Sequence, residues 1–407
     1  MTARFTLARA AGATAAGLSR LTGRGSGTTI GGRVTLIVDP DALAEAAAGR
    51  DLALVTGTNG KTTTRTLLVA ALETLGPVVS NGGGANLPTG LTAALAADRS
   101  SRVGVLEVDE PYLPRVAAAV KPHAVVLLNL SRDQLDRYAE VRRLAGIWRA
   151  ALTGPSAPIA VANADDPLVV WAASAAADVH WVAAGQRWTQ DSTSCPACGD
   201  ILRRDGTGGW RSEGCGLARP TPEWVVDGDR VCVGGEGHEV RLSLPGQVNV
   251  GNAAMAAAAA RLWGVSPADA FAAMTRIPSV EGRYLQTSYT GRPVRLLLAK
   301  NPAGWSEALA MSRPDAPAVV AVNARAADGR DPSWLWDVPF EVLRGRSAVA
   351  TGERSRDVAV RLHYAGVDHV RVDDLADALR SAPGDGPVEV LANYTAFQGY
   401  RRVVGDG

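Results

Sequence analysis

Leu52-Ala-Leu-Val-Thr-Gly-Thr-Asn-Gly-Lys-Thr-Thr-Thr64 places an apolar strand directly before a glycine-containing turn, which is followed by a lysine and three threonines. The apolar run at residues 67–75 predicts a helix that begins at this turn. Backbone N–H groups of such a turn and of the helix N-terminus point at a bound anion. Lys61 can then reach the outer phosphates of a nucleotide, and the Thr62 hydroxyl can ligate Mg²⁺. The stretch therefore predicts a site for ATP or GTP.

This loop departs from the general phosphate-binding pattern G-x-x-x-x-G-K-[ST], because Val55 stands where the pattern has its first glycine. A loop formed by chance is the alternative interpretation. Strand, turn, lysine, hydroxyl and helix nevertheless follow one another in the order that phosphate binding requires. We predict that the phosphates contact the residues of the turn and the first residues of the helix, which are Gly57, Thr58, Asn59, Gly60, Lys61, Thr62 and Thr63.

Length and composition favour a multi-domain cytoplasmic enzyme. The 407 residues suffice for two or three domains, and they contain no apolar run long enough to span a bilayer. The 42 basic and 41 acidic residues give a net charge of +1, so we expect no nucleic-acid partner.

The first residues of the chain are rich in arginine and alanine. They carry Arg4, Arg9, Arg20 and Arg24 but lack the compact apolar core and the cleavage site of a secretory signal. This pattern predicts either a basic amphipathic helix that lies on a membrane or a helix packed on the body of the protein, and we favour the second.

Strands and helices alternate after the phosphate loop. Residues 103–108, 124–130 and 159–163 form short apolar runs that predict strands, and residues 139–152 predict a helix between them. Such alternation is typical of an α/β domain with a parallel sheet, in which ligands bind beyond the carboxyl ends of the strands. Polar residues directly after a strand are therefore the strongest candidates for a site.

Three acidic residues stand at one of these strand ends, in Glu107-Val-Asp-Glu110. Carboxylate oxygens suit Mg²⁺, which bridges the phosphates of a nucleotide. We choose Glu107 as the Mg²⁺ ligand together with Thr62, and a solvated loop is the alternative. Asp165 and Asp166 follow a later strand, where a polar turn and a helix cap explain them equally well.

The chain from about Val34 onward resembles the MurT family of Mur ligases, ATP-dependent enzymes that activate a carboxylate as an acyl phosphate for attack by an amine. The resemblance rests first on the form of the phosphate loop, Thr56-Gly-Thr-Asn-Gly-Lys-Thr-Thr63. It rests also on a series of motifs further along: Glu107-Val-Asp-Glu, Arg132-Asp-Gln-Leu-Asp-Arg-Tyr, Asn249-Val-Gly-Asn-Ala-Ala, Gly282-Arg283, Lys300-Asn-Pro-Ala-Gly, Asp328-Gly-Arg-Asp-Pro-Ser-Trp-Leu-Trp-Asp and Asn393-Tyr-Thr-Ala-Phe.

The resemblance implies an α/β fold with a central P-loop domain of the Mur ligase type, a parallel sheet, an inserted cysteine-containing ribbon and a smaller C-terminal α/β domain. We expect a helical or strand segment at residues 1–48, the ATP-binding domain at 49–288 with the ribbon at about 190–224, and the C-terminal domain at 289–407. Strands of that last domain are predicted at residues 294–298, 318–323, 348–351 and 388–392.

Two asparagines three positions apart, Asn249 and Asn252, lie on one face of a predicted alanine-rich helix. An amide offers a donor and an acceptor together, which matches the edge of adenine, and the resemblance implies that role. A helix cap and a polar helix face are the alternative. Arg283 is expected to clamp the nucleotide phosphates as the domains close, and a surface salt bridge is the alternative.

The ribbon contains Cys195-Pro-Ala-Cys198 and, further on, Cys215. Two complete Cys-x-x-Cys knuckles would predict a structural zinc site. MurT proteins typically carry a cysteine where Ser212 stands here, and serine is a poor zinc ligand. The fourth ligand could be Cys232 or His238, or the segment could be a loop without metal.

Asp328, Asp331 and Asp337 follow the second predicted strand of the C-terminal domain. The resemblance implies a catalytic aspartate in this motif, and we choose Asp331, with Asp337 as the second candidate. A carboxylate there could bind ammonia as ammonium, orient it and accept a proton during its attack.

The resemblance also implies the reaction, which is the amidation of D-glutamate in the stem peptide of lipid II during peptidoglycan synthesis at the inner face of the cell membrane. It implies MgATP as cosubstrate, with Lys61 acting on the transferred phosphoryl group, and a GatD-type glutamine amidotransferase as the partner that supplies ammonia. The chain's own four cysteines offer no recognisable nucleophile turn with a paired histidine.

Two other functions stay open. The first is an amino-acid-adding ligase of the Mur or folylpolyglutamate type, although little chain precedes the phosphate loop for the N-terminal substrate domain of the Mur enzymes. The second is a nucleotide-binding scaffold that regulates an amidotransferase.

Overall fold

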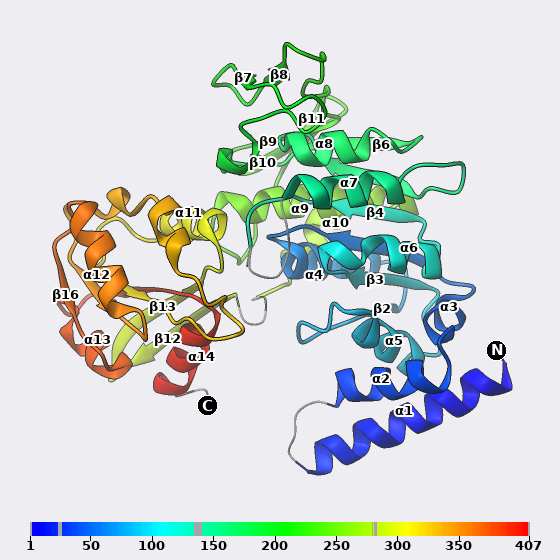
Figure 1. Cartoon of the computed structure of the whole chain (residues 1–407), viewed down its shortest axis with the longest axis horizontal. Coiled ribbons are helices and arrows are strands. Elements are labelled where there is room, and N and C mark those ends of the chain that lie inside the picture. The colour runs from blue at the N-terminus through cyan, green and yellow to red at the C-terminus, as the bar shows by residue number, and fades with distance from the viewer. Residues whose placement is uncertain (1, 23–26, 134–140, 279, 281–282, 406–407) are drawn as a thin grey trace. The chain divides into compact units, whose positions relative to one another are not determined.

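The computed structural model describes residues 2–22, 27–133, 141–278, 280 and 283–405, and it divides the chain into two compact units. The first unit comprises residues 1–130, 141–243 and 247–278, and the second comprises residues 131–140, 244–246 and 279–407. Figure 1 shows both units and labels their helices and strands where there is room. Compact units are not identical to domains, so the expected domain limits at residues 48 and 288 remain predictions.

The first unit is built on a nine-stranded sheet with the strand order β11-β10-β9-β6-β5-β4-β1-β3-β2. Every pair from β9 to β2 in this order is parallel, and β9, β10 and β11 pair antiparallel at the other edge. This arrangement confirms the predicted α/β fold with a parallel sheet. The strands are β1 (Asp51–Thr56), β2 (Val78–Ser80), β3 (Val103–Glu107), β4 (Ala124–Leu127), β5 (Ile159–Asn163), β6 (Val179–Ala183), β9 (Trp224–Asp227), β10 (Arg230–Val233) and β11 (Glu236–Glu239).

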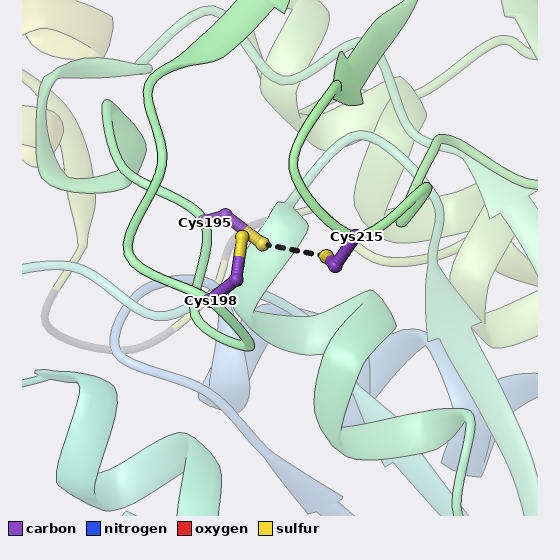
Figure 2. A group of neighbouring side chains, drawn as sticks. All are labelled: Cys195, Cys198 and Cys215. Carbon is purple, nitrogen blue, oxygen red and sulfur yellow. Dashed lines mark hydrogen bonds between the residues drawn. The ribbon is translucent and has the colours of Figure 1, made fainter.

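A ribbon is inserted between β6 and β9. It consists of a short antiparallel pair, β7 (Leu202–Arg204) and β8 (Trp210–Ser212), and two loops that carry cysteines. Figure 2 shows Cys195 and Cys198 on one loop, facing Cys215 on the other. Trp210 is buried, and its indole N–H donates to the carbonyl of Ala164 at 3.1 Å, which ties the ribbon to the end of β5.

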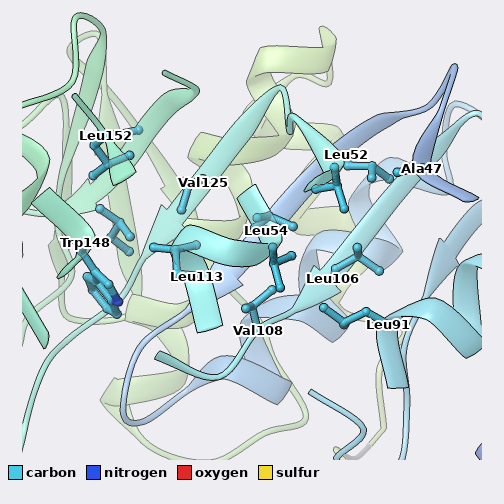
Figure 3. Packing of buried hydrophobic residues seen from close by; sticks show 14 of the residues in the cluster. Ala47, Leu52, Leu54, Leu91, Leu106, Val108, Leu113, Val125, Trp148 and Leu152 are labelled. Carbon is cyan, nitrogen blue, oxygen red and sulfur yellow. The ribbon is translucent and has the colours of Figure 1, made fainter. Parts of the chain in front are cut away.

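Helices cover both faces of the large sheet. Alternate strand residues such as Leu52, Leu54 and Leu106 pack with Leu113 and Trp148 in one continuous core, which Figure 3 shows from close by. On the other face α4 packs against α9. Every residue of α9 from 253 to 260 is buried, and all of them are alanines except Met255. The helices are α3 (Ala42–Ala47), α4 (Lys61–Leu72), α5 (Pro88–Ala97), α6 (Leu113–Val120), α7 (Val141–Ala151), α8 (Pro167–Ala173), α9 (Gln247–Ala260) and α10 (Pro267–Met274), with short 3-10 turns at Glu110–Tyr112, Gln190–Ser192 and Arg261–Trp263.

Two further helices, α1 (Ala3–Leu21) and α2 (Thr28–Val38), precede the sheet. α1 packs on α2 and α2 packs on α5, so the N-terminal segment forms the packed helix that we favoured. In Figure 1 α1 lies at the lower rim of its unit. Across the described residues, no helix combines the length and the apolar character that crossing a membrane requires.

The second unit contains a six-stranded sheet with the order β12-β13-β17-β14-β15-β16, in which only the pair β12 and β13 is antiparallel. Separate apolar cores cover its two faces. The predicted strands at 348–351 and 388–392 agree with β15 and β17. The elements are β12 (Tyr284–Tyr289), β13 (Arg292–Leu298), α11 (Pro302–Met311), β14 (Ala318–Ala321), the 3-10 turns Ser333–Asp337 and Phe340–Leu343, β15 (Ala348–Thr351), α12 (Ser355–Tyr364), β16 (His369–Arg371), α13 (Leu375–Ser381), β17 (Val388–Ala392) and α14 (Tyr394–Val403).

Candidate functional site

The phosphate loop joins the end of β1 to the start of α4. Gly57 and Gly60 both have positive φ, at 148° and 86°, a region that side chains with a Cβ rarely adopt. A Cβ at Gly57 would lie 2.7 Å from the Cβ of Leu128, and one at Gly60 would lie 2.6 Å from Oδ1 of Asn252. Glycine is therefore required at both positions. Val55, which replaces the first glycine of the general pattern, lies within β1 opposite Glu107 of β3.

Lys61 is buried at the N-terminus of α4 and is surrounded by oxygen atoms. Its Nζ donates to the carbonyl of Gly57 at 2.6 Å and to Oε2 of Glu110 at 2.8 Å, and it lies 3.9 Å from Oδ1 of Asp109. Burial alone would lower the pKa of Lys61, but the charges of Glu110 and Asp109 outweigh it and the pKa is raised. The site thus holds a full positive charge at the place where a nucleotide's phosphates are expected.

Glu110 is the acid that directly contacts Lys61, whereas sequence reasoning gave first place to Glu107. Burial by itself would raise the pKa of Glu110, yet Lys61 holds it below its ordinary value, so both partners are charged. Glu107 is also buried, with its carboxylate 3.7 Å from Nε of Arg65. Its backbone N–H donates to Oδ1 of Asn81 at 2.8 Å, which fixes the end of β3. The Mg²⁺ role of Glu107 and Thr62 remains a prediction.

Asn129 holds the apex of the phosphate loop in place. Its carbonyl accepts the N–H of Thr58 at 2.9 Å, its Oδ1 accepts the N–H of Asn59 at 2.9 Å, and its Nδ2 donates to the carbonyl of Asn59 at 3.0 Å. The side chain imitates one step of strand pairing. Sequence reasoning assigned no role to Asn129, although its position just beyond β4 is the kind of place where ligand-binding residues of parallel sheets occur.

Asp165 and Asp166 act as structural groups, in agreement with the turn and helix-cap alternative. Oδ1 of Asp166 accepts the N–H of Leu168 in the first turn of α8, and its Oδ2 accepts the N–H of Leu130, both at 2.9 Å. Burial raises the pKa of Asp166 to about 6, although these hydrogen bonds favour the charged form. Asp165 pairs with Arg219 at 2.7 Å.

Asn249 and Asn252 lie together on α9, as predicted. Nδ2 of Asn252 donates to Oδ1 of Asn249 at 3.1 Å, and Oδ1 of Asn252 accepts the Thr64 hydroxyl at 3.3 Å. Asn252 therefore links α9 to the helix that begins at the phosphate loop. The predicted contact of these amides with adenine remains a prediction.

The three cysteines of the ribbon form a group suited to a metal ion, with sulfur atoms all within 4.8 Å of one another. Sγ of Cys195 and Cys215 lie 3.5 Å apart, close to the roughly 3.8 Å that tetrahedral Zn–S bonds of about 2.3 Å would give. Oγ of Ser212 lies 3.3 Å from Sγ of Cys198 and 3.6 Å from Sγ of Cys215. The hydrogen bond with Ser212 lowers the pKa of the Cys198 thiol to about 7, which favours the thiolate that metals bind.

Neither Cys232 nor His238 belongs to this group, so the expectation that one of them could complete the metal shell is wrong for the described residues. Both lie on strands of the large sheet, Cys232 on β10 and His238 on β11. Instead, the hydroxyl of Ser212 lies next to the thiols of Cys198 and Cys215. The three thiols fit a zinc ion, and the fourth position is left for Ser212 or another oxygen donor.

The three aspartates after β14 have different surroundings. Asp328 is buried, and its Oδ1 accepts the N–H of Thr395 at the start of α14 at 2.8 Å. Asp331 is exposed, and its carboxylate accepts the N–H and the hydroxyl of Ser333, both at 2.9 Å, which lowers its pKa. Asp337 pairs with Arg132 at 3.1 Å. Asp331 is thus a charged, accessible carboxylate, and it lines a hollow with Trp336 and Arg356.

An asparagine pair at the carboxyl edge of the second sheet was not predicted. The N–H of Asn323 donates to Oδ1 of Asn393 at 3.0 Å, and Nδ2 of Asn393 donates to the carbonyl of Asn323 at 2.6 Å. Arg283 belongs to the same unit, where its carbonyl accepts the N–H of Leu298 at 3.1 Å. Gly282 and residues 134–138 of the motif that begins at Arg132 lie outside the described residues.

Comparison with known proteins extends these observations over nearly the whole chain. The profile of the Mur ligase middle domain matches residues 55–260, and that of the MurT ligase C-terminal domain matches residues 298–397. The chain is similar to the lipid II isoglutaminyl synthase (glutamine-hydrolyzing) subunit MurT of Streptococcus pneumoniae, with 29% identity over 95% of this chain and 94% of the relative. Similarity to the subunit of the same name from Staphylococcus aureus is 28% over 93% of both chains.

Among solved structures, a pseudomurein peptide ligase type C from Methanothermus fervidus superposes with a TM-score of 0.69 at 20% identity. The match covers 87% of this chain and 78% of that one. At this identity the likeness speaks for the fold, and it agrees with the P-loop sheet described above.

Proposed function

The chain belongs to the Mur ligase family, and from this premise we propose that it is the synthetase subunit of a lipid II isoglutaminyl synthase. In this proposal it uses ATP to amidate the D-glutamate carboxylate of the lipid II stem peptide to D-isoglutamine. The observation that carries the proposal is the buried, charged Lys61 under a glycine loop, in a chain that matches the MurT subunits over 93–95% of its length. It acts in the cytoplasm, at the inner face of the cell membrane.

The first half-reaction transfers the terminal phosphoryl group of ATP to a carboxylate oxygen of the substrate, and ADP leaves. Lys61 holds the outer phosphates, and Glu110 and Asp109 keep it charged. Thr62 and Glu107 would hold Mg²⁺, which would supply positive charge next to the transferred group. Asn249 and Asn252 contact adenine, and Arg283 contacts phosphate. These groups act mainly through charge and position, as phosphoryl transfer requires.

The second half-reaction is attack of ammonia on the acyl phosphate carbon, with departure of inorganic phosphate. Asp331 orients the nitrogen and takes its proton, because its carboxylate is charged and accessible. Asp337 is the second candidate for this role. The ammonia comes from a GatD-type glutamine amidotransferase, a proposal that is supported by the word subunit in the names of both MurT relatives.

The decisive experiment supplies lipid II, MgATP and glutamine to the chain alone and to the chain with a GatD-type partner, and analyses the lipid by mass spectrometry. An amide product with the pair, and with the chain alone when ammonium replaces glutamine, is the expected result. A product enlarged by a whole amino acid would establish the amino-acid-adding ligase instead. Retained ATP binding without any product would favour the scaffold.

We also propose that the ribbon binds a structural zinc ion through Cys195, Cys198 and Cys215. The test compares the zinc content and zinc affinity of the wild type with those of Ser212→Cys and Ser212→Ala. Ser212→Cys completes a four-thiolate shell and is expected to bind zinc at least about tenfold more tightly. Absence of zinc from the wild type and from Ser212→Cys alike would show that the segment is a loop without metal.

A further inference from the structure

Helix α1 uses only one of its faces to pack on the protein. Phe5, Ala8 and Gly12 are buried on that face. The approach to α2 is close, since a Cβ added at Gly12 would lie 2.7 Å from the carbonyl oxygen of Gly31. Thr2 caps the helix by accepting the N–H of Phe5 with its side chain at 3.1 Å. The helix is thus firmly attached, and its other side is left to solvent.

That other side of α1 carries large apolar side chains in water. Leu7 is 65% exposed, Leu18 is 59% exposed and Leu21 is 85% exposed. Together with Ala3, Ala10 and Thr14 they recur at intervals of three or four residues, so they form one stripe along the helix. At 1.5 Å per residue the stripe is about 27 Å long. The stripe is apolar except at Thr14, and an extended, largely apolar surface of this kind usually marks an interaction site.

The neighbouring helix α2 adds to the exposed apolar surface. Ile30 is 48% exposed and Ile37 is 70% exposed. They stand two turns apart on the same side of α2, with the exposed Arg33 between them. The N-terminal pair of helices therefore exposes five large aliphatic side chains.

The charge of this segment is one-sided. Residues 1–38 contain no acidic residue and no lysine, and five arginines: Arg4, Arg9, Arg20, Arg24 and Arg33. The whole chain has 42 basic and 41 acidic residues, so the part beyond residue 38, with five fewer basic residues, carries net negative charge. On α1, Arg9 and Arg20 lie on one side of the leucine stripe, at about a quarter turn or more around the helix from it. Arg4 borders the stripe on its other side.

We propose that the outer face of α1, together with α2, is a docking surface for an anionic lipid bilayer. Leu7, Leu18 and Leu21 enter the boundary between head groups and acyl chains, while the arginines contact lipid phosphates. Leucines flanked by arginines fit such a surface, and Asp39, the acid that pairs with Arg4 at 3.9 Å, is itself buried. A second copy of the chain fits it poorly, because it would bring a segment with the same positive charge into contact. The inference holds whether or not lipid II is the substrate.

The test measures flotation of the full chain with two kinds of vesicle. One kind consists of phosphatidylcholine alone, and the other consists of phosphatidylcholine and phosphatidylglycerol in equal amounts. Neither vesicle contains lipid II, so the result is independent of the proposed reaction. Binding to the anionic vesicles only, weakened by added salt, is expected. Equal binding to both kinds of vesicle, or binding to neither, would overturn the proposal.

The triple variant Leu7→Ser, Leu18→Ser and Leu21→Ser tests the apolar stripe. It should weaken binding to anionic vesicles by about a hundredfold, since partial burial of each leucine contributes a factor of several. The control replaces three exposed apolar residues elsewhere, Leu75, Ile201 and Val342, by serine and should bind as the wild type does. Circular dichroism and thermal unfolding of both variants verify that the helices remain folded.

The double variant Arg9→Gln and Arg33→Gln tests the charge. It should weaken vesicle binding about 25-fold and flatten the salt dependence, because each arginine near an anionic surface contributes about a fivefold factor. The matched control, Arg99→Gln with Arg203→Gln, changes the net charge equally on the exposed surface of the same unit.

Two other outcomes would assign the surface to a different partner. If the triple leucine variant abolished concentration-dependent self-association in light scattering and left vesicle binding unchanged, the surface would serve a second copy. If it abolished binding of the amidotransferase partner and left vesicle binding unchanged, the surface would serve that protein. Either result would refute the lipid proposal.

Discussion

An asparagine side chain fixes the carboxyl edge of each of the two sheets, but the two edges differ in function. In the first unit the side chain of Asn129 makes two hydrogen bonds with the backbone of Asn59. In the second unit the side chain of Asn393 makes two hydrogen bonds with the backbone of Asn323. Each asparagine imitates strand pairing just beyond the last residues of a parallel sheet. Both edges are therefore fixed in shape before any ligand arrives.

The two edges differ in the charge that they bury. The first edge encloses Lys61 with Glu110, and Glu107 with Arg65; Lys61, Glu107 and Glu110 are buried and Arg65 is partly buried. The second edge is held by the amides of Asn323 and Asn393 and by the buried carboxylate of Asp328, and its accessible acid, Asp331, stands outside on a turn. Buried ion pairs contribute little net stability because removing them from water is costly. We therefore attribute the buried charge at the first edge to the binding of a ligand. We attribute the hydrogen bonds at the second edge to the positioning of its loops.

Removal of the buried positive charge should have the largest effect. Lys61→Met is expected to lower ligase activity by about a thousandfold or more, because it removes the charge that we propose stabilises the transferred phosphoryl group. Glu110 would also be left buried without its partner, so the measurement pairs steady-state activity with thermal unfolding. Lys121→Met is the control, since Lys121 is exposed at the end of α6. Activity within tenfold of the wild type would place the phosphates elsewhere.

At the second edge the corresponding test is a pair of isosteric changes. Asp331→Asn should lower amide formation by about a hundredfold while nucleotide binding stays as in the wild type, because it removes only the group that we propose orients and deprotonates ammonia. Asp337→Asn loses an ion pair with Arg132 that is about one-third exposed, so its effect should stay within a few-fold. Activity and ATP affinity are measured at saturating ammonium. The reverse order of effects would assign the base to Asp337.

The asparagine pair allows the two edges to be compared directly. Asn129→Ala and Asn393→Ala each remove two hydrogen bonds, so each should lower the free energy of unfolding by about 1–3 kcal/mol. Only Asn129→Ala should raise the KM for ATP, by about tenfold, since the phosphate loop is attached to that residue. Denaturant unfolding and ATP titration of both variants check this. Equal changes in KM would mean that the second edge supports ATP binding as much as the first edge does.

Sequence could predict the first edge more completely than the second. The phosphate loop is contiguous, so its lysine and glycines are visible in a single stretch of chain. The contact of Lys61 with Glu110 is not visible there, because it depends on the register that sets Val55 of β1 opposite Glu107 of β3. The role of Asn129 depends likewise on the pairing of β1 with β4.

Other features could not be predicted from the sequence for related reasons. β12 was not predicted because it is an edge strand whose residues are only partly buried, so it lacks a strong apolar pattern. Cys232 and His238 looked suitable as metal ligands by residue type, but both lie on strands of the large sheet outside the cysteine group. Asp331 could be named only through the family resemblance, since a single acid on an exposed turn carries no signal of its own.

The smallest expected effect concerns the acid that supports the first edge. Asp166 accepts the N–H of Leu130, the residue after Asn129, and its pKa is raised by burial from 3.8 to about 6. A raised pKa means that the folded state holds the proton more tightly than the unfolded state, so stability from this group falls as pH rises through about 4 to 6. Between pH 5 and pH 7 the wild type should lose about 1 kcal/mol relative to Asp166→Asn, which cannot titrate.

Denaturant unfolding of both proteins at the two pH values gives this difference, and the titration of other groups cancels in it. Asp328 at the second edge offers the comparison, because it supports α14 through Thr395 as Asp166 supports α8. The difference between wild type and Asp166→Asn should change with pH, and the nucleotide affinity of the wild type should follow the same curve, since Leu130 continues the segment that fixes the phosphate loop. A difference that stays constant from pH 5 to pH 7 would show that Asp166 is already charged throughout, and that its three backbone hydrogen bonds outweigh its burial.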